Sequence, residues 1–300
     1  MTEHVNNIST SYHFFIKKQT VLMILNSMEL HKNAHKKIRI GQINILNNPT
    51  GEKERYTLLQ EHITTKNIEI ITVQEILNIQ LLKNKMSEIG LKYSAIATQT
   101  EHDYVAIFSK YPITATNSIN LVKHSRDAAF SEIQTPQGIL RVVSTHFIWG
   151  NNNEEQSLNS AMILNKIAQE YSKDNIPFII GGDFNSDDTS RTMRYLHGKD
   201  LDINNESTFW TDPYEIFGNK NNWETTDQGF NNWGIETATK HNILIPELLP
   251  KSRIDYLLSY GWTYGKIGSP LSYERFGQPQ TGTTHLSDHY GILTDILLGL

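Results

Sequence analysis

From Ile38 onward the chain alternates short apolar runs with amphipathic stretches. Runs of four to eight apolar or β-branched residues predict strands, and apolar residues spaced three and four apart predict helices. We expect strands at 38–45, 68–73, 104–108, 128–133, 139–145, 177–180, 254–258 and 290–296, and helices at 56–63, 79–89 and 156–171. Strand–helix–strand crossovers and direct strand–strand successions both occur. The pattern therefore favours a mixed sheet over a purely parallel one.

The domain organisation follows from the segments that lack this alternation of apolar runs and amphipathic stretches. No internal repeat and no Pro/Ser-rich linker divides the chain, so we predict an N-terminal arm at 1–37 and a single domain at 38–300. The arm holds five Lys against Glu3 and Glu29, a net charge of +3, which leaves −8 for the rest of a chain whose total is −5. Residues 204–249 are rich in Asn, Gly and Trp and have little period. A connection this long is usually functional or disordered.

Composition narrows the class of protein. In 300 residues, 38% are hydrophobic and 20% are charged, which is typical of a soluble globular chain. No apolar run approaches the ~20 residues of a membrane span, and the run 21–25 is shorter than the core of a secretory signal. We expect no transmembrane segment, a cytoplasmic location with secretion as the alternative, and a monomer. The absence of cysteine excludes disulfides, thiolate metal sites and cysteine nucleophiles.

Polar residues recur where the predicted strands end. Asn44, Glu75, His146 and Asp183 each follow or close an apolar run, and Asn185 comes two residues after Asp183. Each has an ordinary interpretation, such as a solvated strand end or a tight turn with an Asx hydrogen bond. Binding clefts in open α/β sheets form at strand ends. Four strands that deliver such side chains therefore predict one shared site.

Asp255 lies inside the apolar run 254–258, where an ionised carboxylate is costly unless it is paired. The segment Ser287-Asp288-His289 precedes the last predicted strand and supplies a candidate partner. A carboxylate that holds a histidine fixes its tautomer and supports the imidazolium form. The alternative is a structural Asp255 bonded to backbone amides, with His289 in a surface loop.

Taken in order, these motifs resemble the endonuclease/exonuclease/phosphatase superfamily. The group includes DNase I, abasic-site endonucleases, sphingomyelinases, inositol-polyphosphate 5-phosphatases and deadenylases. The matching segments are Asn44, Gln74-Glu75, Thr145-His146, Gly182-Asp183-Phe184-Asn185, Arg253-Ile254-Asp255-Tyr256 and Ser287-Asp288-His289, with 106–113 between the second and the third. The resemblance covers 38–296. It implies a four-layer α/β sandwich, in which two packed mixed sheets are flanked by helices.

The resemblance also implies a divalent-metal-dependent hydrolase of phosphate esters, with Mg²⁺ or Mn²⁺ as cofactor. Asn44, Glu75 and Asp288 would be metal ligands, which suits a hard cation that prefers oxygen. Asp183 would activate the attacking water, and Asn185 would fix the phosphate. His289, held by Asp255, would stabilise the pentacovalent state or pass a proton. His146 would contact a phosphate oxygen or protonate the leaving group.

One departure concerns a phosphate contact. The family often carries an Arg in the helix after the third motif, whereas residues 151–166 contain none. Arg126 is the candidate replacement for substrate binding, and an exposed, solvated Arg126 is the alternative.

The substrate is the least determined feature. Trp149, Trp210, Trp223 and Trp233 could stack on bases, hold a choline-like cation, insert at a lipid surface or be buried. The acidic body argues against a groove built for DNA alone, because such grooves carry Lys and Arg. We expect a phosphodiesterase or nuclease acting on nucleic acid. The alternatives are a phospholipid or inositol-phosphate phosphoesterase and, less favoured, a non-catalytic binding protein.

Overall fold

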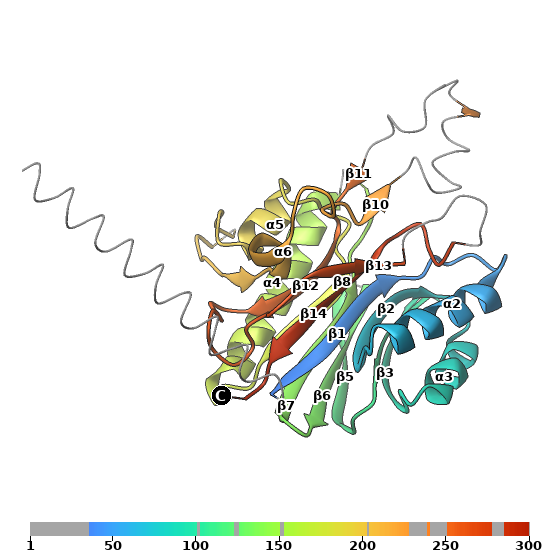
Figure 1. Cartoon of the computed structure of the whole chain (residues 1–300). Coiled ribbons are helices and arrows are strands. Elements are labelled where there is room, and N and C mark those ends of the chain that lie inside the picture. Colours follow the sequence, from blue (N-terminus) through green and yellow to red (C-terminus); the bar gives the residue numbers. More distant parts are fainter. Residues whose placement is uncertain are drawn as a thin grey trace, which may run out of the picture.

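Two six-stranded sheets, packed face to face, make up the body of the protein in a computed structural model (Figure 1). The structure describes residues 36–100, 103–122, 126–150, 153–202, 204–227, 239–240, 251–277 and 285–299. The first sheet has the strand order β13-β14-β1-β2-β4-β3, and the second β5-β6-β7-β8-β12-β9. Each sheet contains one parallel pair, β1 with β2 and β7 with β8, among antiparallel neighbours. The sheets are thus mixed, as the sequence predicts.

The strands have the following bounds: β1 Lys37–Asn44, β2 Ile70–Ile76, β3 Tyr93–Thr100, β4 Asp103–Ser109, β5 Ile113–Val122, β6 Arg126–Thr135, β7 Gly138–His146, β8 Phe178–Asp183, β9 Trp210–Thr211, β10 Thr226–Asp227, β11 Lys251–Ser252, β12 Asp255–Tyr260, β13 Glu274–Phe276 and β14 Gly291–Leu297. The helices are α2 Glu52–Thr65, α3 Ile79–Glu88, α4 Glu154–Tyr171, α5 Arg191–Leu196 and α6 Pro213–Phe217. A 3₁₀ turn, Ser172–Asp174, follows α4, and β10 pairs with β11 in a short ribbon.

The helices form the outer two layers. Tyr56 and Leu59 of α2 share an apolar cluster with Ile71 of β2, and Leu82 of α3 joins the same cluster. On the other side, α4 and α5 pack on β7, β8 and β12 in a second cluster. Figure 1 shows α2 and α3 beside the first sheet and α4 and α5 beside the second. This arrangement confirms the predicted four-layer sandwich.

A third apolar cluster fills the space between the sheets. Its members come from the strand positions that face the opposite sheet, including Ile40 and Ile70 of the first sheet and Val142, Ile179 and Leu257 of the second. Alternate residues of the same strands face the helices instead, since side chains in a strand point to opposite faces with a period of two. Nearly every central strand is therefore buried on both sides, which explains the continuous apolar runs in the sequence.

Some elements lie outside the predicted ones. The edge strand β5 carries mostly exposed side chains, so it has no apolar run to announce it. The two-residue strands β9, β10 and β11 and the short helices α5 and α6 are also too brief for a period to show. Parts of the predicted loop 204–249, namely 228–238 and 241–249, lie outside the described residues. So do residues 1–35, and the N-terminal arm therefore stays a prediction.

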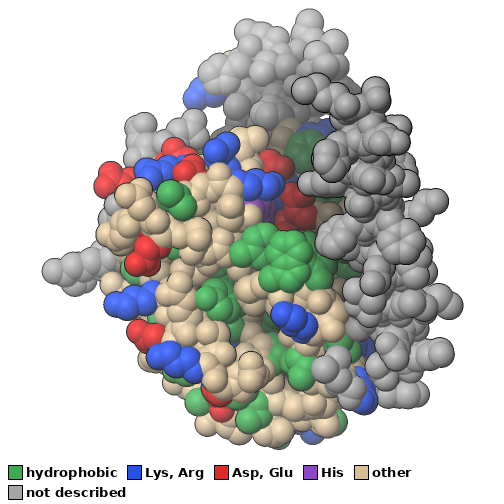
Figure 2. All heavy atoms as spheres, turned by 90° about the vertical axis from the view of Figure 1, so that its left-hand side faces the viewer, with side chains coloured by type: hydrophobic (Ala, Val, Ile, Leu, Met, Phe, Trp, Pro, Cys, Tyr) green, Lys and Arg blue, Asp and Glu red, His purple; other side chains and the backbone are tan. Residues whose placement is uncertain are grey.

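Aromatic side chains gather on the surface near the end of β12. The Trp262 ring lies 5.0 Å from that of Phe209 and 4.8 Å from that of Tyr264, measured between centroids. Figure 2 shows a group of hydrophobic side chains in the middle of the face that it draws.

None of the helices in the described part of the chain combines the length and apolar content needed to cross a bilayer.

Candidate active site

Toward one end of the sandwich, the space between the sheets changes from apolar to polar. Along β1 the inward positions run Ile38, Ile40, Gln42 and Asn44, so the last two place polar groups where the first two place hydrocarbon. In the second sheet, pairing sets His146 of β7 opposite Asp183 of β8, and Asp183 opposite Asp255 of β12. Adjacent strands therefore end at the same level and present their terminal side chains to one space.

Glu75 reaches this space through an irregularity in β2. Its neighbours Ile71 and Val73 face the helices, and a regular strand would point Glu75 the same way. The pairing of β2 with β4 shifts between Val73 and Ile76, and Glu75 has a positive φ of 57°. A bulge of this kind re-aims a side chain, and strained backbone is commonly found at functional sites.

Two glycines let the strands approach closely beside the site. A Cβ added to Gly181 would lie 2.3 Å from Thr72 Oγ1 of the opposite sheet, and one added to Gly182 would lie 2.1 Å from the carbonyl oxygen of Thr145. Both distances are far below van der Waals contact. Packing thus requires both glycines: Gly181 lets the opposite sheet come close, and Gly182 lets the neighbouring strand β7 come close.

Asp183 lies at the centre of the group. Its Oδ2 accepts a hydrogen bond from Asn44 Nδ2 at 3.0 Å, and its Oδ1 accepts one from the Asn185 backbone N–H at 2.8 Å. The same Oδ2 lies 3.6 Å from His146 Nε2 and 3.9 Å from His289 Nε2. Burial raises the pKa of Asp183 and the nearby charge of Asp255 raises it further, although both histidines oppose the rise.

Asp255 and His289 form a buried pair. His289 Nδ1 lies 2.8 Å from Asp255 Oδ2, and Asp255 Oδ1 accepts a hydrogen bond from Gln42 Nε2 at 3.0 Å. Burial alone would lower the pKa of His289, but the charge of Asp255 and the hydrogen bond to it raise the pKa well above its usual value. The imidazole is therefore held as a cation, with Nδ1–H toward Asp255 and Nε2–H toward Asp183.

Glu75 and His146 lie on the other side of Asp183. Glu75 accepts hydrogen bonds from Asn44 Nδ2 at 2.9 Å and from the Asn47 backbone N–H at 2.9 Å. Burial raises the pKa of Glu75, but His146 and these hydrogen bonds bring it below its usual value. Burial lowers the pKa of His146 and outweighs the attraction of Asp183 and Glu75, so this imidazole is neutral at neutral pH.

Gln42 and Ser144, behind the site, were not singled out in the sequence, and Gln74 appeared there only as part of a motif. Gln42 Nε2 donates to Gln74 Oε1 at 2.8 Å as well as to Asp255, and Gln74 Nε2 donates to Ser144 Oγ at 3.1 Å. These buried side chains link the two sheets and orient Asp255. A signal was present, since Gln42 falls at an inward position of an otherwise apolar strand, two residues before Asn44.

Three further predicted site residues, Asn44, Asn185 and Asp288, are placed as follows, and their roles stay predictions. Asn44 directs its amide nitrogen at the carboxylates, while its oxygen accepts the Leu46 N–H at 3.1 Å. Asn185 uses its side-chain nitrogen on the Phe147 carbonyl at 3.0 Å. Asp288 lies outside the two groups of acidic and histidine side chains whose ligand atoms converge in the described part of the chain.

Arg126 pairs with a residue that the sequence did not single out. Its Nη1 donates to Asp103 Oδ2 at 3.2 Å, and its side chain is only 17% exposed, which argues against the solvated alternative. Burial raises the pKa of Asp103 to about 6 in spite of the attraction of Arg126. Arg126 is close enough to His146 to lower the pKa of that imidazole.

The donor set fits a hard divalent cation. Ligand atoms of Glu75, His146 and Asp183 lie within 4.8 Å of one another, and those of Asp183, Asp255 and His289 form a second such group. His146 Nε2 is 3.8 Å from Glu75 Oε1, too long for a hydrogen bond, and His146 Nδ1 has no hydrogen-bond partner in the described structure. Carboxylate oxygens are the ligands that Mg²⁺ and Mn²⁺ prefer.

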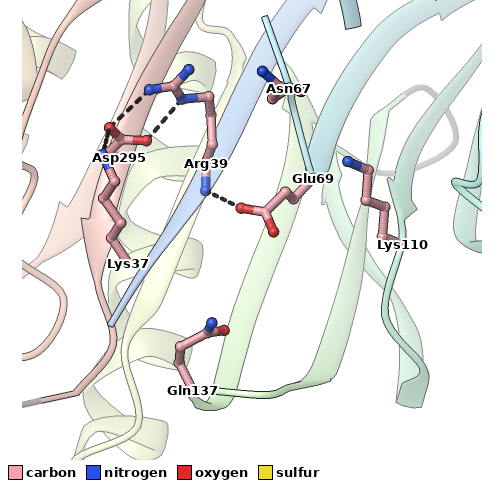
Figure 3. Close-up of a pocket in the computed structure, with 7 residues that line it drawn as sticks. All are labelled: Lys37, Arg39, Asn67, Glu69, Lys110, Gln137 and Asp295. Carbon is pink, nitrogen blue, oxygen red and sulfur yellow. Dashed lines mark hydrogen bonds and ion pairs between the residues drawn. The ribbon is translucent and has the colours of Figure 1, made fainter. Parts of the chain in front are cut away.

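A hollow lies at the opposite end of the sandwich from these residues. It has a volume of about 380 Å³ and is lined by seven residues, Lys37, Arg39, Asn67, Glu69, Lys110, Gln137 and Asp295. Figure 3 shows Lys37 and Arg39 directed at Asp295, and the Arg39 backbone N–H directed at Glu69. Asp295 forms ion pairs with Lys37 and Arg39, and Glu69 accepts a hydrogen bond, so these charges are paired with cations or donors of the protein.

A family model agrees with this geometry. The model of the Endonuclease/Exonuclease/phosphatase family matches residues 41–289, which include the described side chains of the site. The chain belongs to this family. Members of the family hydrolyse phosphate esters with a divalent metal, so membership indicates a phosphoesterase. The family predicted from the sequence is thereby confirmed. No curated protein matches the chain at a significant level.

Solved structures of the family share the fold. D. rerio TDP2 complexed with single-strand DNA product is 13% identical, with a TM-score of 0.68 over 87% of this chain and 98% of that one. The human Nocturnin catalytic domain with bound sulfate anion is 18% identical, with a TM-score of 0.65 over 87% and 93%. The family protein from Bacteroides vulgatus is 19% identical, with a TM-score of 0.65 over 87% and 99%. At these identities the likeness shows the fold alone.

Proposed function

We propose that this protein is a divalent-metal-dependent phosphodiesterase that acts on nucleic acid by in-line attack of an activated water. The observation that carries the proposal is the environment of Asp183 Oδ2. This oxygen faces Asn44 and His146 on one side and the cationic His289 on the other, at 3.0, 3.6 and 3.9 Å. A base, a cation and further polar groups thus meet around one point.

Each side chain has a task that its environment suits. The raised pKa of Asp183 makes its carboxylate a better acceptor for the proton of a water molecule. The His289 Nε2–H would donate to a phosphoryl oxygen as charge builds there, and Asp255 would keep the imidazole protonated and correctly turned. The neutral His146 would hydrogen-bond a second oxygen.

The metal site would be centred on Glu75, whose ionised carboxylate is fixed by Asn44 and Asn47. Mg²⁺ in such enzymes is usually held by one or two carboxylates together with water and substrate phosphate. A bound Mg²⁺ or Mn²⁺ would offset the charge on a phosphate oxygen and on the leaving group. Asn44 would keep Glu75 and Asp183 close together despite their like charges.

Nucleic acid is the substrate that has the most support. One structure with this fold, the D. rerio TDP2 complex, contains a single-strand DNA product. Arg126, paired with Asp103 and electrostatically coupled to His146, is a further candidate phosphate contact. The acidic body offers few other phosphate contacts, so we expect affinity for single strands to fall with salt less steeply than in a strongly basic nuclease.

The test is a hydrolysis panel with Mg²⁺ and with Mn²⁺. Single-stranded DNA, single-stranded RNA, plasmid DNA, sphingomyelin, inositol phosphates and the generic diester bis-p-nitrophenyl phosphate would be assayed with the wild type and with Asp183→Asn. We expect turnover of the nucleic acids and of the generic diester by the wild type only. Turnover confined to sphingomyelin or inositol phosphates would replace the proposed substrate. No turnover of any substrate would remove the enzymatic proposal.

A further inference from the structure

Trp149 stands out as a large apolar side chain left in water beside the site. It is 72% exposed, more than any other large hydrophobic side chain that the structure describes. It follows His146 by three residues, and a chain covers at most about 10 Å over that distance. Phe147, the first of the two residues between them, is buried, and its ring lies 4.7 Å from that of Phe184. The chain therefore leaves the core at Phe147 and reaches the surface at Trp149.

The backbone that carries Trp149 is fastened on both sides. Phe147 donates its N–H to the Asp183 carbonyl at 2.9 Å and accepts from Asn185 Nδ2 at 3.0 Å. The Trp149 carbonyl accepts from Asn153 Nδ2 at 2.7 Å, and Gly150 turns the chain there with a φ of 113°. The indole is thus presented at the rim by a segment that is hydrogen-bonded to two site residues.

The exposed ring has no aromatic neighbour in the described structure, unlike Trp262, which packs between Phe209 and Tyr264. Several aromatic rings form the cages that hold quaternary ammonium groups. Insertion into a lipid surface needs a wider apolar patch. A single flat ring suits stacking on another flat ring, which is how proteins hold single-stranded bases without reading their sequence.

We propose that Trp149 is a stacking platform for a nucleobase of the substrate, next to the scissile phosphate. The inference rests on the proposed function and makes it more specific. It also accounts for binding by an acidic body: affinity would come from base stacking where phosphate neutralisation is limited. The substrate segment at the rim would be single-stranded, because a paired and stacked base has no free face for the indole.

The test compares two oligonucleotides of equal length and charge, one with all its bases and one with abasic tetrahydrofuran nucleotides around the cleavage position. Trp149→Ala should lower kcat/KM about tenfold on the base-containing strand, mostly through KM, and leave the abasic strand unchanged. Trp149→Phe should retain most of the wild-type value. Trp262→Ala is the matched control, since Trp262 is 64% exposed and lies seven residues beyond Asp255 along and past β12, about 20 Å away.

The outcomes separate this inference from the proposed function. Turnover of bis-p-nitrophenyl phosphate by the wild type, with loss in Asp183→Asn, tests the function first. If that arm succeeds and Trp149→Ala equals the wild type on both oligonucleotides, stacking is wrong while the function stands. An equal loss on both strands would also overturn it, because the defect would not depend on bases. Binding of the wild type, but not of Trp149→Ala, to phosphatidylcholine vesicles would assign the ring to a lipid surface instead.

Discussion

Each end of the sandwich buries an aspartate, and the surroundings shift the pKa values of Asp295 and Asp183 in opposite directions. At one end, Asp295 accepts hydrogen bonds from Lys37 Nζ at 2.7 Å and from Arg39 Nε at 2.8 Å (Figure 3). Arg39 Nη1 also donates to the Lys66 carbonyl at 2.9 Å. At the other end, Asp183 faces Asp255, and its cationic neighbour His289 stays 3.9 Å away. Burial raises the pKa of Asp295 too, but Arg39 and Lys37 reverse the shift and lower it, whereas the pKa of Asp183 stays raised.

The difference indicates which end is built for stability and which for chemistry. A carboxylate with a lowered pKa stabilises the folded state at neutral pH, and one with a raised pKa destabilises it. Polar groups that cost stability are retained where binding or catalysis needs them. We therefore expect the end of the sheets at Asn44 and Asp183 to be the functional end, whereas the ion pairs of Asp295 with Lys37 and Arg39 join β14 to β1 within one sheet.

The largest expected effect is metal removal. Excess EDTA should abolish hydrolysis of bis-p-nitrophenyl phosphate, and added Mg²⁺ or Mn²⁺ should restore it, because Glu75 offers a hard-oxygen ligand at the functional end. Titrating either metal into the wild type should also raise the Tm, since a ligand that binds only the folded state stabilises it. Glu75→Gln should lose that rise, and Asp295→Ala should keep it. Full activity in the chelator would remove the metal from the proposal.

The next effect is expected from Asp183→Asn. The change removes the proposed base and should lower kcat by about 10³-fold. The Tm should stay the same or rise, because a destabilised buried carboxylate is replaced by an amide that is neutral. Steady-state kinetics and thermal melts of the same preparation check both parts. Near-wild-type turnover would show that Asp183 has another role, and a collapsed Tm would make it structural.

Asp255→Asn should have a smaller effect, about 10²-fold on kcat, the scale of a weakened transition-state contact. The change keeps the volume but removes the charge that raises the His289 pKa, so that pKa should fall and the pH–rate profile should change with it. NMR titration of His289 in the two proteins is the measurement. In the structure the Asp255 carboxylate contacts Gln42 and His289, which favours the pair over a carboxylate bonded to backbone amides. An unchanged His289 pKa together with unchanged turnover would show that Asp255 does not act through His289.

The smallest expected effect is at the opposite end. Asp295→Ala should lower the free energy of unfolding by about 1–3 kcal/mol, because Lys37 and Arg39 are partly exposed and the pairs are partly screened. It should leave kcat unchanged. The pKa of Asp295 is lowered on folding, so its contribution is present above its unfolded pKa of about 4 and is lost as the pH falls through the folded value. Urea unfolding at pH 7 and pH 3 should show a difference between wild type and variant that shrinks at the lower pH.

Much of the fold could be predicted from the sequence because the central strands are buried on both faces. Ile38–Ile45 is an example, since one set of its side chains packs on helices and the other on the opposite sheet. The edge strand β5 could not be predicted, because its exposed side chains are selected for solubility rather than for packing. Asp103 was missed for a related reason, since nothing in its local sequence shows that Arg126 will pair with it.

The candidate site, like the fold, has features that follow from the sequence and features that depend on the packed structure. The sequence by itself determined which chemical groups the strands carry, because an Asp or Glu at the end of a buried strand is a local departure from the apolar pattern. Only the tertiary structure decided how those groups act. The bulge at Glu75, the amide orientation of Asn44 and the approach of Gln42 to Asp255 depend on contacts between residues 30 to more than 200 positions apart. Pairing across the two sheets also decides which carboxylate is stabilised and which is left with a raised pKa, because burial and neighbouring charge are properties of the packed chain.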